Sequence, residues 1–269
     1  MTKPRILVLR KMSALEYYYK HQNKDPELKN GHDNHSRNVE LVKQILTAEG
    51  IKFDLATREE ISESIISEYD ALFSLGGDGT AVAGGFFNKN TPQLNLVSDD
   101  RSEGVLCQKD IPLAIANFLS GNYRIENWTK QDVFLDGKFI ARPLNETCVG
   151  EDGLDFSQMA RYDLEVNYNH YCNLGRQIGS GLVIATGTGS TGWKREFSPF
   201  PRTANWLEFS AISPVRGMEK GRGRYFRITY KKYKGTFKVD ATKYDFPRDS
   251  VLEIKLSEFP LRVIVPNLK

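Results

Sequence analysis

Apolar and polar residues along the first part of the chain predict strands and helices in turn. Short apolar runs predict strands, and segments with apolar residues at helical spacing predict helices. The predicted strands are residues 5–9, 51–55, 71–75 and 92–98, and the predicted helices are residues 36–49, 58–67 and 112–119. Because parallel strands are joined by helical crossovers, this part of the chain predicts an α/β lobe with a parallel sheet.

The stretch before the first helix has no clear apolar period. Residues 16–36 are rich in Tyr, His, Lys and Asn, and they are predicted to be irregular or a frayed helix. The helix that follows is expected to begin at a polar cap, Asn34 or Ser36, and to end at Gly50.

From about residue 124 to residue 246, strand patterns dominate. Asp136 and Gly137 separate two short apolar runs, which is a strong signal for a hairpin with a type I′ turn. Residues 162–168 alternate between apolar and polar, and residues 224–230, 235–239 and 251–265 also read as strands. We therefore expect an α/β lobe followed by an all-β lobe, with a ligand crevice between them, where such sites commonly lie.

Composition places the chain among globular proteins. It has 269 residues, of which 40% are hydrophobic and 26% charged, and its net charge of +3 gives no reason to expect a nucleic-acid partner. Three scattered cysteines fit a reducing compartment. No apolar run approaches the ~20 residues of a membrane helix, and no signal or transit peptide is recognisable. The expected location is cytoplasmic; a mitochondrial matrix location would require that a transit peptide had been removed.

The first candidate site is the run Gly76-Gly77-Asp78-Gly79-Thr80, directly after an apolar strand. Loops at the carboxyl ends of parallel strands form ligand crevices, and glycines let backbone N–H groups approach phosphate oxygens. The single carboxylate can accept a proton from a hydroxyl or hold Mg²⁺, which is the logic of phosphoryl transfer. The alternative is a plain turn. Two further glycines, at residues 84 and 85, argue against a helix here, since each costs about 1 kcal/mol.

The second candidate site is the run of small residues from Thr186 to Gly192, which follows an apolar strand and ends at Trp193. Its hydroxyl and N–H groups can surround phosphates or ribose, and the indole ring can wall the pocket. The alternative is a flexible surface loop. The pair Asn145-Glu146 can read a base edge and a ribose diol, or it can be an ordinary loop pair.

Two other polar sets have simpler explanations. The basic run between residues 216 and 234 is either a solvated face or a positive wall that attracts polyanions. The four histidines have no metal-ligand spacing and are expected at the surface, and no metal-binding residue is predicted. No GxSxG elbow, Walker lysine loop or GxGxxG run is present, which removes the commonest hydrolase, P-loop kinase and dehydrogenase interpretations.

Taken together and in this order, the motifs resemble the NAD kinase family. They are Gly76–Thr80, the pair Asn145-Glu146 and Gly181–Trp193, and the resemblance covers most of the chain. GGDGT is shared with diacylglycerol and sphingosine kinases, so it specifies only the superfamily. Residues 35–40, 101–104 and 180–182 are most similar to the mitochondrial type of animal NAD kinase.

The resemblance implies an ATP-dependent kinase that phosphorylates the adenosine-ribose 2′-hydroxyl of NAD to give NADP. It implies a Rossmann-like, phosphofructokinase-like α/β lobe (residues 1–106, completed by 253–269) and a β-sandwich lobe that binds NAD (residues 107–252). Mg²⁺ would accompany ATP, no membrane or nucleic acid would be involved, and the chain would form a homodimer or homotetramer.

Residue roles follow from the same resemblance. Asp78 would be the base, Asn145 and Glu146 would hold adenine and ribose, and the donor would sit across the first two glycines of the GGDGT run. The residues assigned to nucleotide binding are Gly76, Gly77, Gly79, Thr80, Asn145, Glu146, Ser180, Thr188, Thr191, Gly192 and Trp193.

The sequence also departs from the family pattern. Ser180 stands where most members have Asp, Val105 where an aromatic residue stacks on adenine, and Asp240-Ala241-Thr242 where Asp-Gly-Gln is common. Two alternatives therefore stay open: a lipid or other small-alcohol kinase of the GGDGT superfamily, and a catalytically inactive NAD(P)-binding sensor. The sequence does not decide between ATP and polyphosphate, between NAD and NADH, or what regulates the protein.

Overall fold

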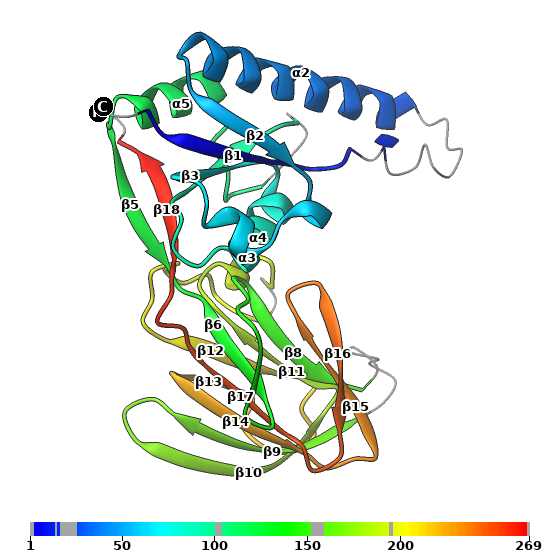
Figure 1. Ribbon diagram of the computed structural model, residues 1–269. Helices are drawn as coiled ribbons and strands as arrows, with labels where there is room; N and C mark the ends of the chain where they lie inside the picture. The colour runs from blue at the N-terminus through cyan, green and yellow to red at the C-terminus, as the bar shows by residue number, and fades with distance from the viewer. Residues whose placement is uncertain are drawn as a thin grey trace. The chain divides into compact units, whose positions relative to one another are not determined.

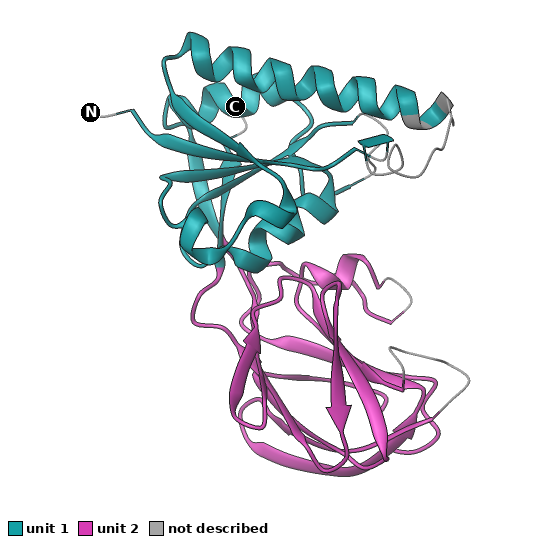
Figure 2. Cartoon of the chain, turned by 45° about the vertical axis from the view of Figure 1, so that its right-hand side comes forward, with its two compact units in different colours: residues 1–126, 261–269 teal, residues 127–260 magenta. Residues whose placement is uncertain are grey.

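The computed structural model divides the chain into two compact units (Figure 2). It describes residues 3–13, 15–16, 26–99, 104–151, 159–193 and 196–267. Unit 1 comprises residues 1–126 and 261–269, and unit 2 comprises residues 127–260. The first unit was expected to end at residue 106 and to be completed by residues 253–269. Its first segment extends further, because β5 (Tyr123–Trp128) belongs to its sheet and α5 (Ile111–Leu119) packs on that sheet.

Unit 1 is built on a six-stranded sheet with the order β2-β1-β3-β4-β18-β5 (Figure 1). The pairs β2–β1, β1–β3, β3–β4 and β4–β18 are all parallel, as the alternation of strands and helices predicted. The strands are β1 (Arg5–Arg10), β2 (Lys52–Ala56), β3 (Ala71–Gly76), β4 (Gln93–Val97) and β18 (Leu261–Pro266). Because β18 returns from the end of the chain, the segment read as one strand over 251–265 is two strands in different units.

Helices cover both faces of this sheet. One apolar core joins the sheet to α2 (Pro26–Ala48) and α5, and a second joins its other face to the region of α3 (Glu63–Ile66) and α4 (Asp78–Phe87). The short 3₁₀ helix η1 (Arg58–Glu60) follows β2. Each strand of the α/β core therefore ends at one common edge of the sheet, where ligands bind in such folds.

Two helices differ from the prediction. Helix α2 begins at Pro26, and its buried stripe opens with Gly31 and His35, which are not apolar and so are invisible to a hydrophobic pattern. Helix α4 forms in spite of its glycine pair. A Cβ at Gly84 would lie 3.2 Å from side-chain atoms of both Leu72 and Gln93, so this glycine lets α4 pack closely on β3 and β4.

Unit 2 is made of two six-stranded antiparallel sheets, with orders β10-β9-β14-β17-β6-β7 and β13-β12-β11-β8-β15-β16. Aromatic rings pack between the sheets. The ring centroids of Phe209 and Phe226 lie 6.0 Å apart in an edge-on arrangement, and those of Tyr230 and Phe246 lie 5.0 Å apart. The β-sandwich expected for this part of the chain is confirmed. Its strands are β6 (Gln131–Leu135), β7 (Lys138–Ala141), β8 (Glu146–Gly150), β9 (Ala160–Asn167), β10 (Tyr171–Gly179), β11 (Gly181–Ala185), β12 (Leu207–Ile212), β13 (Lys220–Gly223), β14 (Tyr225–Tyr230), β15 (Lys234–Val239), β16 (Thr242–Pro247) and β17 (Val251–Leu256).

The predicted hairpin turn is present between β6 and β7. Asp136 and Gly137 have φ values of 49° and 78°, which is the left-handed pair that a type I′ turn requires. No helix in the described ranges is long and apolar enough to cross a bilayer.

Candidate functional site

Asp78 lies at the start of α4, at the carboxyl end of β3. Its two carboxylate oxygens accept hydrogen bonds from the backbone N–H groups of Val105 and Leu106, both at 3.0 Å. These two contacts hold the carboxylate in one orientation at the ligand-binding edge of the sheet. A side chain fixed in this way is prepared to accept a proton without rearrangement.

The segment that holds Asp78 is itself shaped around the carboxylate. A Cβ at Gly104 would lie 2.3 Å from Asp78 Oδ1, so no larger residue fits there while the carboxylate keeps its place. The Cys107 thiol lies 3.9 Å from the same oxygen. Burial, and secondarily the Asp78 charge, raise the pKa of Cys107 to about 12, so this thiol is protonated near neutral pH and is no nucleophile.

The glycines of the GGDGT run have different reasons to be glycine. A Cβ at Gly76 would lie 2.0 Å from Thr80 Oγ1, so packing alone requires Gly76. A Cβ at Gly79 would meet no atom within 4 Å, and Gly79 does not have a positive φ. Neither packing nor backbone geometry therefore explains Gly79. Glycine at such a position is typical of a backbone that a ligand approaches closely.

A pocket of about 520 Å³ opens at Asp78. Its walls come from the carboxyl ends of β1 and β3, from η1 after β2 and from the first turns of α4. Three cationic side chains, Arg10, Lys11 and Arg58, line it together with Glu59 and Asp78. These cations were not predicted from the sequence, because Arg58 is far along the chain from Arg10 and Lys11 and only the strand order β2-β1-β3 brings them to one edge.

In unit 2, the pair Asn145-Glu146 lies in the turn that leads into β8, and Asp240 fixes this turn. The Asp240 carboxylate accepts the backbone N–H groups of Leu144, Asn145 and Glu146 at 3.1, 3.0 and 3.2 Å. Burial raises the pKa of Asp240, while these three N–H groups oppose the rise. In the sequence, Asp240 matches the first residue of the family's Asp-Gly-Gln, and its structural role depends on contacts across nearly a hundred residues.

The Thr/Gly run packs directly against this turn. A Cβ at Gly189 would lie 2.4 Å from the Asn145 carbonyl oxygen and 3.0 Å from Glu146 Oε2, and the Trp193 side chain forms a hydrogen bond with the Glu146 carboxyl group. Burial, followed by the neighbouring charge of Asp240, raises the pKa of Glu146 to about 8. Glu146 is therefore largely protonated near neutral pH and can donate as well as accept a hydrogen bond.

Thr186 joins the two segments. Its hydroxyl donates to the Leu144 carbonyl at 2.6 Å and accepts the N–H groups of Thr188 and Gly189 at 3.1 and 3.2 Å. The Thr191 hydroxyl donates to the Thr188 carbonyl, while the buried Thr188 hydroxyl has no hydrogen-bond partner among the residues that are described. The run is therefore an ordered turn that contains the 3₁₀ helix η2 (Gly189–Thr191), and the flexible-loop alternative is wrong.

Two glycines of this run also differ in what they require. A Cβ at Gly187 would lie 2.1 Å from the Pro201 carbonyl oxygen, so packing requires glycine there. A Cβ at Gly192 would make only ordinary contact, 3.5 Å from the Gly189 carbonyl oxygen. As with Gly79, closeness to a ligand is the remaining reason for glycine at residue 192.

Ser180 does not join this group. It lies just before β11, while Thr186 follows the same strand, so the six residue-to-residue steps from Ser180 to Thr186 span about 20 Å at roughly 3.3 Å each. Ser180 is buried, and its N–H donates to the Ile212 carbonyl. A contact of Ser180 with the nucleotide stays a prediction.

The basic run of unit 2 is a face of paired charges. Arg222 pairs with Glu208, Arg227 with Glu165, Lys231 with Asp163 and Asp249, and Lys232 with Glu151. Alternating cations that are matched by carboxylates on neighbouring strands are typical of a solvated sheet face. This favours the simpler explanation over a positive wall.

One histidine departs from the expected surface position. His35 is buried on α2, and burial together with the charge of Lys11 lowers its pKa to about 4. His35 is therefore neutral near neutral pH. His21 and residues 101–103 lie outside the described residues.

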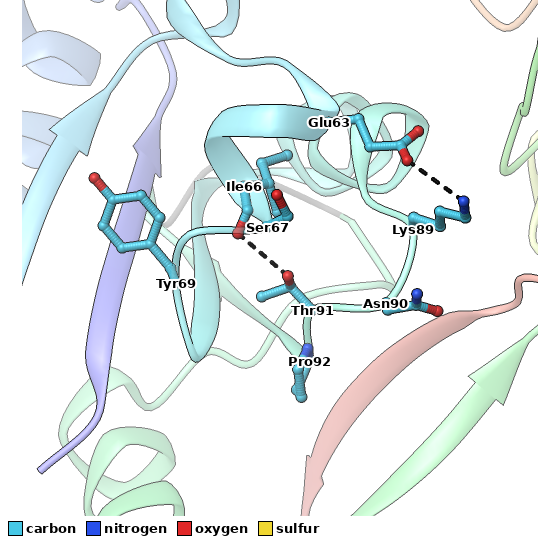
Figure 3. A pocket seen from close by; sticks show the side chains of 8 residues that line it. All are labelled: Glu63, Ile66, Ser67, Tyr69, Lys89, Asn90, Thr91 and Pro92. Carbon is cyan, nitrogen blue, oxygen red and sulfur yellow. Dashed lines mark hydrogen bonds and ion pairs between the residues drawn. The ribbon is translucent and has the colours of Figure 1, made fainter. Parts of the chain in front are cut away.

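A second pocket in unit 1, of about 390 Å³, lies on the opposite edge of the sheet (Figure 3). Glu63 and Lys89 form an ion pair of 3.8 Å above it, and the Thr91 hydroxyl donates to the Ile66 carbonyl at 3.2 Å. Because this pocket opens at the amino ends of β3 and β4, it is separate from Asp78 and the candidate site.

No protein-family profile matches the chain. In sequence it is 27% identical over 240 residues to human NAD kinase 2, mitochondrial, a match that covers 71% of this chain and 52% of the relative. The chain spans about half the length of the curated relatives that it matches first.

Two solved structures share the whole fold. One is an NAD kinase from Archaeoglobus fulgidus in complex with ATP, with a TM-score of 0.71, 17% identity, and coverage of 98% of this chain and 93% of that one. The other is yeast NADH kinase complexed with NADH, with a TM-score of 0.69, 13% identity, and coverage of 99% and 85%.

The chain therefore shares the fold of these two structures, with an α/β unit and a β-sandwich unit. The resemblance to the NAD kinase family that the motifs indicated is confirmed by both sequence and fold. The cytoplasmic location is not supported, since the mammalian relatives are mitochondrial by name.

Proposed function

We propose that the chain is an NAD kinase, which transfers the γ-phosphoryl group of ATP to the adenosine-ribose 2′-hydroxyl of NAD. The oxygen of that hydroxyl attacks the γ-phosphorus, its proton passes to Asp78, and ADP leaves with the electron pair of the broken P–O bond. The products are NADP, ADP and a proton. The named relatives and the shared fold support this reaction.

The observation that carries the proposal is the position of Asp78. Its carboxylate is held by two backbone N–H groups at the carboxyl edge of a parallel sheet, beside the first turn of a helix. A positioned general base contributes roughly 10²–10⁴-fold to rate. The N–H groups of the α4 N-terminus favour anionic oxygens close to that base.

The proposed reaction uses Mg²⁺, which would bind together with the phosphates of ATP. The described residues contain no group of three His, Cys, Asp or Glu side chains that could hold a metal ion. Mg²⁺ is commonly bound through one or two carboxylates together with substrate phosphates, and Asp78 and Glu59 are the two carboxylates that line this pocket. When bound, the ion neutralises charge on the phosphates.

In unit 2, the proposal assigns the nucleotide to the turn at Asn145 and Glu146 and to the Thr/Gly run. A largely protonated Glu146 donates one hydrogen bond and accepts another, which suits the two hydroxyls of a ribose. Gly192, which packing does not require, allows the backbone to lie against the ligand. Ser180, and a homodimer or homotetramer that would bring a second copy near it, stay predictions.

The proposal is tested by incubating the purified chain with NAD, ATP and Mg²⁺ and measuring NADP by a coupled enzymatic assay. NADP formation is the expected result. A folded chain that binds NAD without forming NADP would favour the inactive-sensor alternative. A chain that binds no NAD would remove the proposal and return attention to other alcohol acceptors.

A further inference from the structure

The pocket at Asp78 holds more positive charge than the motif predicted. The residues that give it polar character are Arg10, Lys11, Arg58, Glu59, Asp78 and the backbone of Gly79. They come from the ends of three adjacent strands, β2, β1 and β3, and from the helix start that follows β3. Cations gathered at a helix N-terminus create a local preference for anions.

The three cations are not equally available to a ligand. Arg10 donates to both oxygens of Glu16, at 3.0 and 3.2 Å, so its charge is already matched. Lys11 reaches the buried Asp99 carboxylate only at 3.5 Å. Arg58 is exposed, and within the described part of the chain its guanidinium has no ion pair or hydrogen bond.

The helix that carries Arg58 is rigid at its start. Thr57 and Glu60 form a capping box, in which Glu60 Oε2 accepts the Thr57 N–H at 2.7 Å and the Thr57 hydroxyl at 2.8 Å. This arrangement uses the Glu60 carboxylate within η1. Arg58 thus lies on a short turn in which the Glu60 carboxylate is bonded to Thr57.

The rest of the lining is uncharged: Thr80 and Gly77 belong to the GGDGT run, and Leu9, Met12 and Ala83 are apolar. No aromatic ring and no side-chain amide is among the described residues that line it. A pocket of this kind offers cations for phosphate oxygens, and its described lining offers no aromatic ring on which a nucleobase could stack.

We propose that Arg58, assisted by Lys11, binds the terminal phosphates of the phosphoryl donor in this pocket, so that the donor is selected here by its polyphosphate and not by its base. This inference rests on the proposed function for its reaction, but the binding of a polyphosphate does not require turnover. Arg58 acts as a binding residue: its planar fork matches two phosphate oxygens at once, which a lysine matches less well.

The test measures binding of inorganic tripolyphosphate to the whole chain by isothermal titration calorimetry. Arg58→Ala is expected to raise the Kd about 10-fold, and Arg58→Lys to give an intermediate value. Arg37→Ala is the matched control, since Arg37 is an exposed arginine on α2 outside the pocket. An unchanged Kd in Arg58→Ala, or an equal loss in Arg37→Ala, would overturn the proposal.

Turnover separates the inference from the function on which it rests. In an NADP assay, Arg58→Ala should raise KM for ATP about 10-fold and leave kcat and KM for NAD unchanged, because the variant retains Asp78 and all of unit 2. A fall in kcat with unchanged KM for ATP would contradict a binding role. If wild type formed no NADP, while its tripolyphosphate binding still depended on Arg58, the phosphate site would stand and the NAD kinase reaction would fall.

Discussion

Replacing Asp240 with Asn tests the account of the Asn145-Glu146 turn. Asp240 has a φ of 48°, a left-handed conformation that Asn adopts as readily as Asp, so the substitution leaves the turn geometry intact. An amide oxygen in the place of Oδ1 keeps the contacts to Asn145 and Glu146. The amide nitrogen then faces the Leu144 N–H, which loses its acceptor.

The expected cost follows from those three contacts. A hydrogen bond to a charged acceptor contributes about 1.5–3 kcal/mol and one to a neutral acceptor about 0.5–1.5 kcal/mol. The substitution weakens two such bonds and removes one, while it relieves the repulsion between Asp240 and Glu146. We expect the free energy of unfolding of unit 2 to fall by about 2–4 kcal/mol.

The loss of unfolding free energy in Asp240→Asn should also depend on pH. The pKa of Glu146 is raised from its ordinary value of 4.5 to about 8, so the folded state holds a proton that the unfolded state releases between these values. Stability from this group is complete below pH 4.5 and is lost as pH rises toward 8. Without the Asp240 charge, the pKa of Glu146 falls and this loss ends at a lower pH. The variant is therefore less destabilised, relative to wild type, at about pH 8.5 than at about pH 6.

Tryptophan fluorescence during urea unfolding is the suitable assay, because Trp128, Trp193 and Trp206 all lie in unit 2. Asp136→Asn is the matched control: Asp136 has a φ of 49° in a hairpin turn and accepts one exposed N–H, from Val251 at 2.8 Å. The control should cost about 1 kcal/mol at either pH. If Asp240→Asn costs no more than the control, or costs the same at both pH values, the reasoning is refuted.

Three glycine substitutions probe the rest of the site. Gly104→Ala places a Cβ 2.3 Å from Asp78 Oδ1, so kcat for NADP formation should fall by roughly 10- to 100-fold with an unchanged urea midpoint; a normal kcat would contradict the fixed carboxylate. Gly189→Ala places a Cβ 2.4 Å from the Asn145 carbonyl oxygen and should cost unit 2 about 1–3 kcal/mol in urea unfolding, so a variant of wild-type stability would speak against this packing. Gly79→Ala meets no atom within 4 Å and should not lower the free energy of unfolding, yet it should weaken tripolyphosphate binding measured by calorimetry; wild-type affinity would remove Gly79 from the site.

The sequence was sufficient for the parallel sheet, the antiparallel sheets and the Asp136-Gly137 hairpin. These features depend on the local periodicity of apolar residues and on the residue types at turns, and both can be read from a single sequence. Helix α2 was predicted too short because its first buried positions, Gly31 and His35, are not apolar. Helix α4 was missed because Gly84, which weakens it locally, is needed for its packing on β3 and β4.

Part of the candidate site could be named from the sequence. Asp78, Asn145 and Glu146 were candidates because they stand in recognisable motifs, and their roles stay predictions. Asp240 and Arg58 were not, because Asp240 accepts hydrogen bonds from residues distant in sequence and Arg58 reaches the Asp78 pocket only through the strand order. A positive-φ turn residue and a cation after a strand are weak signals until the strand order is known.

The measurement that tests the central claim most directly is NADP formation by Asp78→Asn beside wild type, with NAD affinity and circular dichroism recorded for both proteins. The account predicts a variant that folds and binds NAD as wild type does but forms NADP at least about 100-fold more slowly. Near-normal turnover by the folded variant would contradict the role of Asp78 as the base.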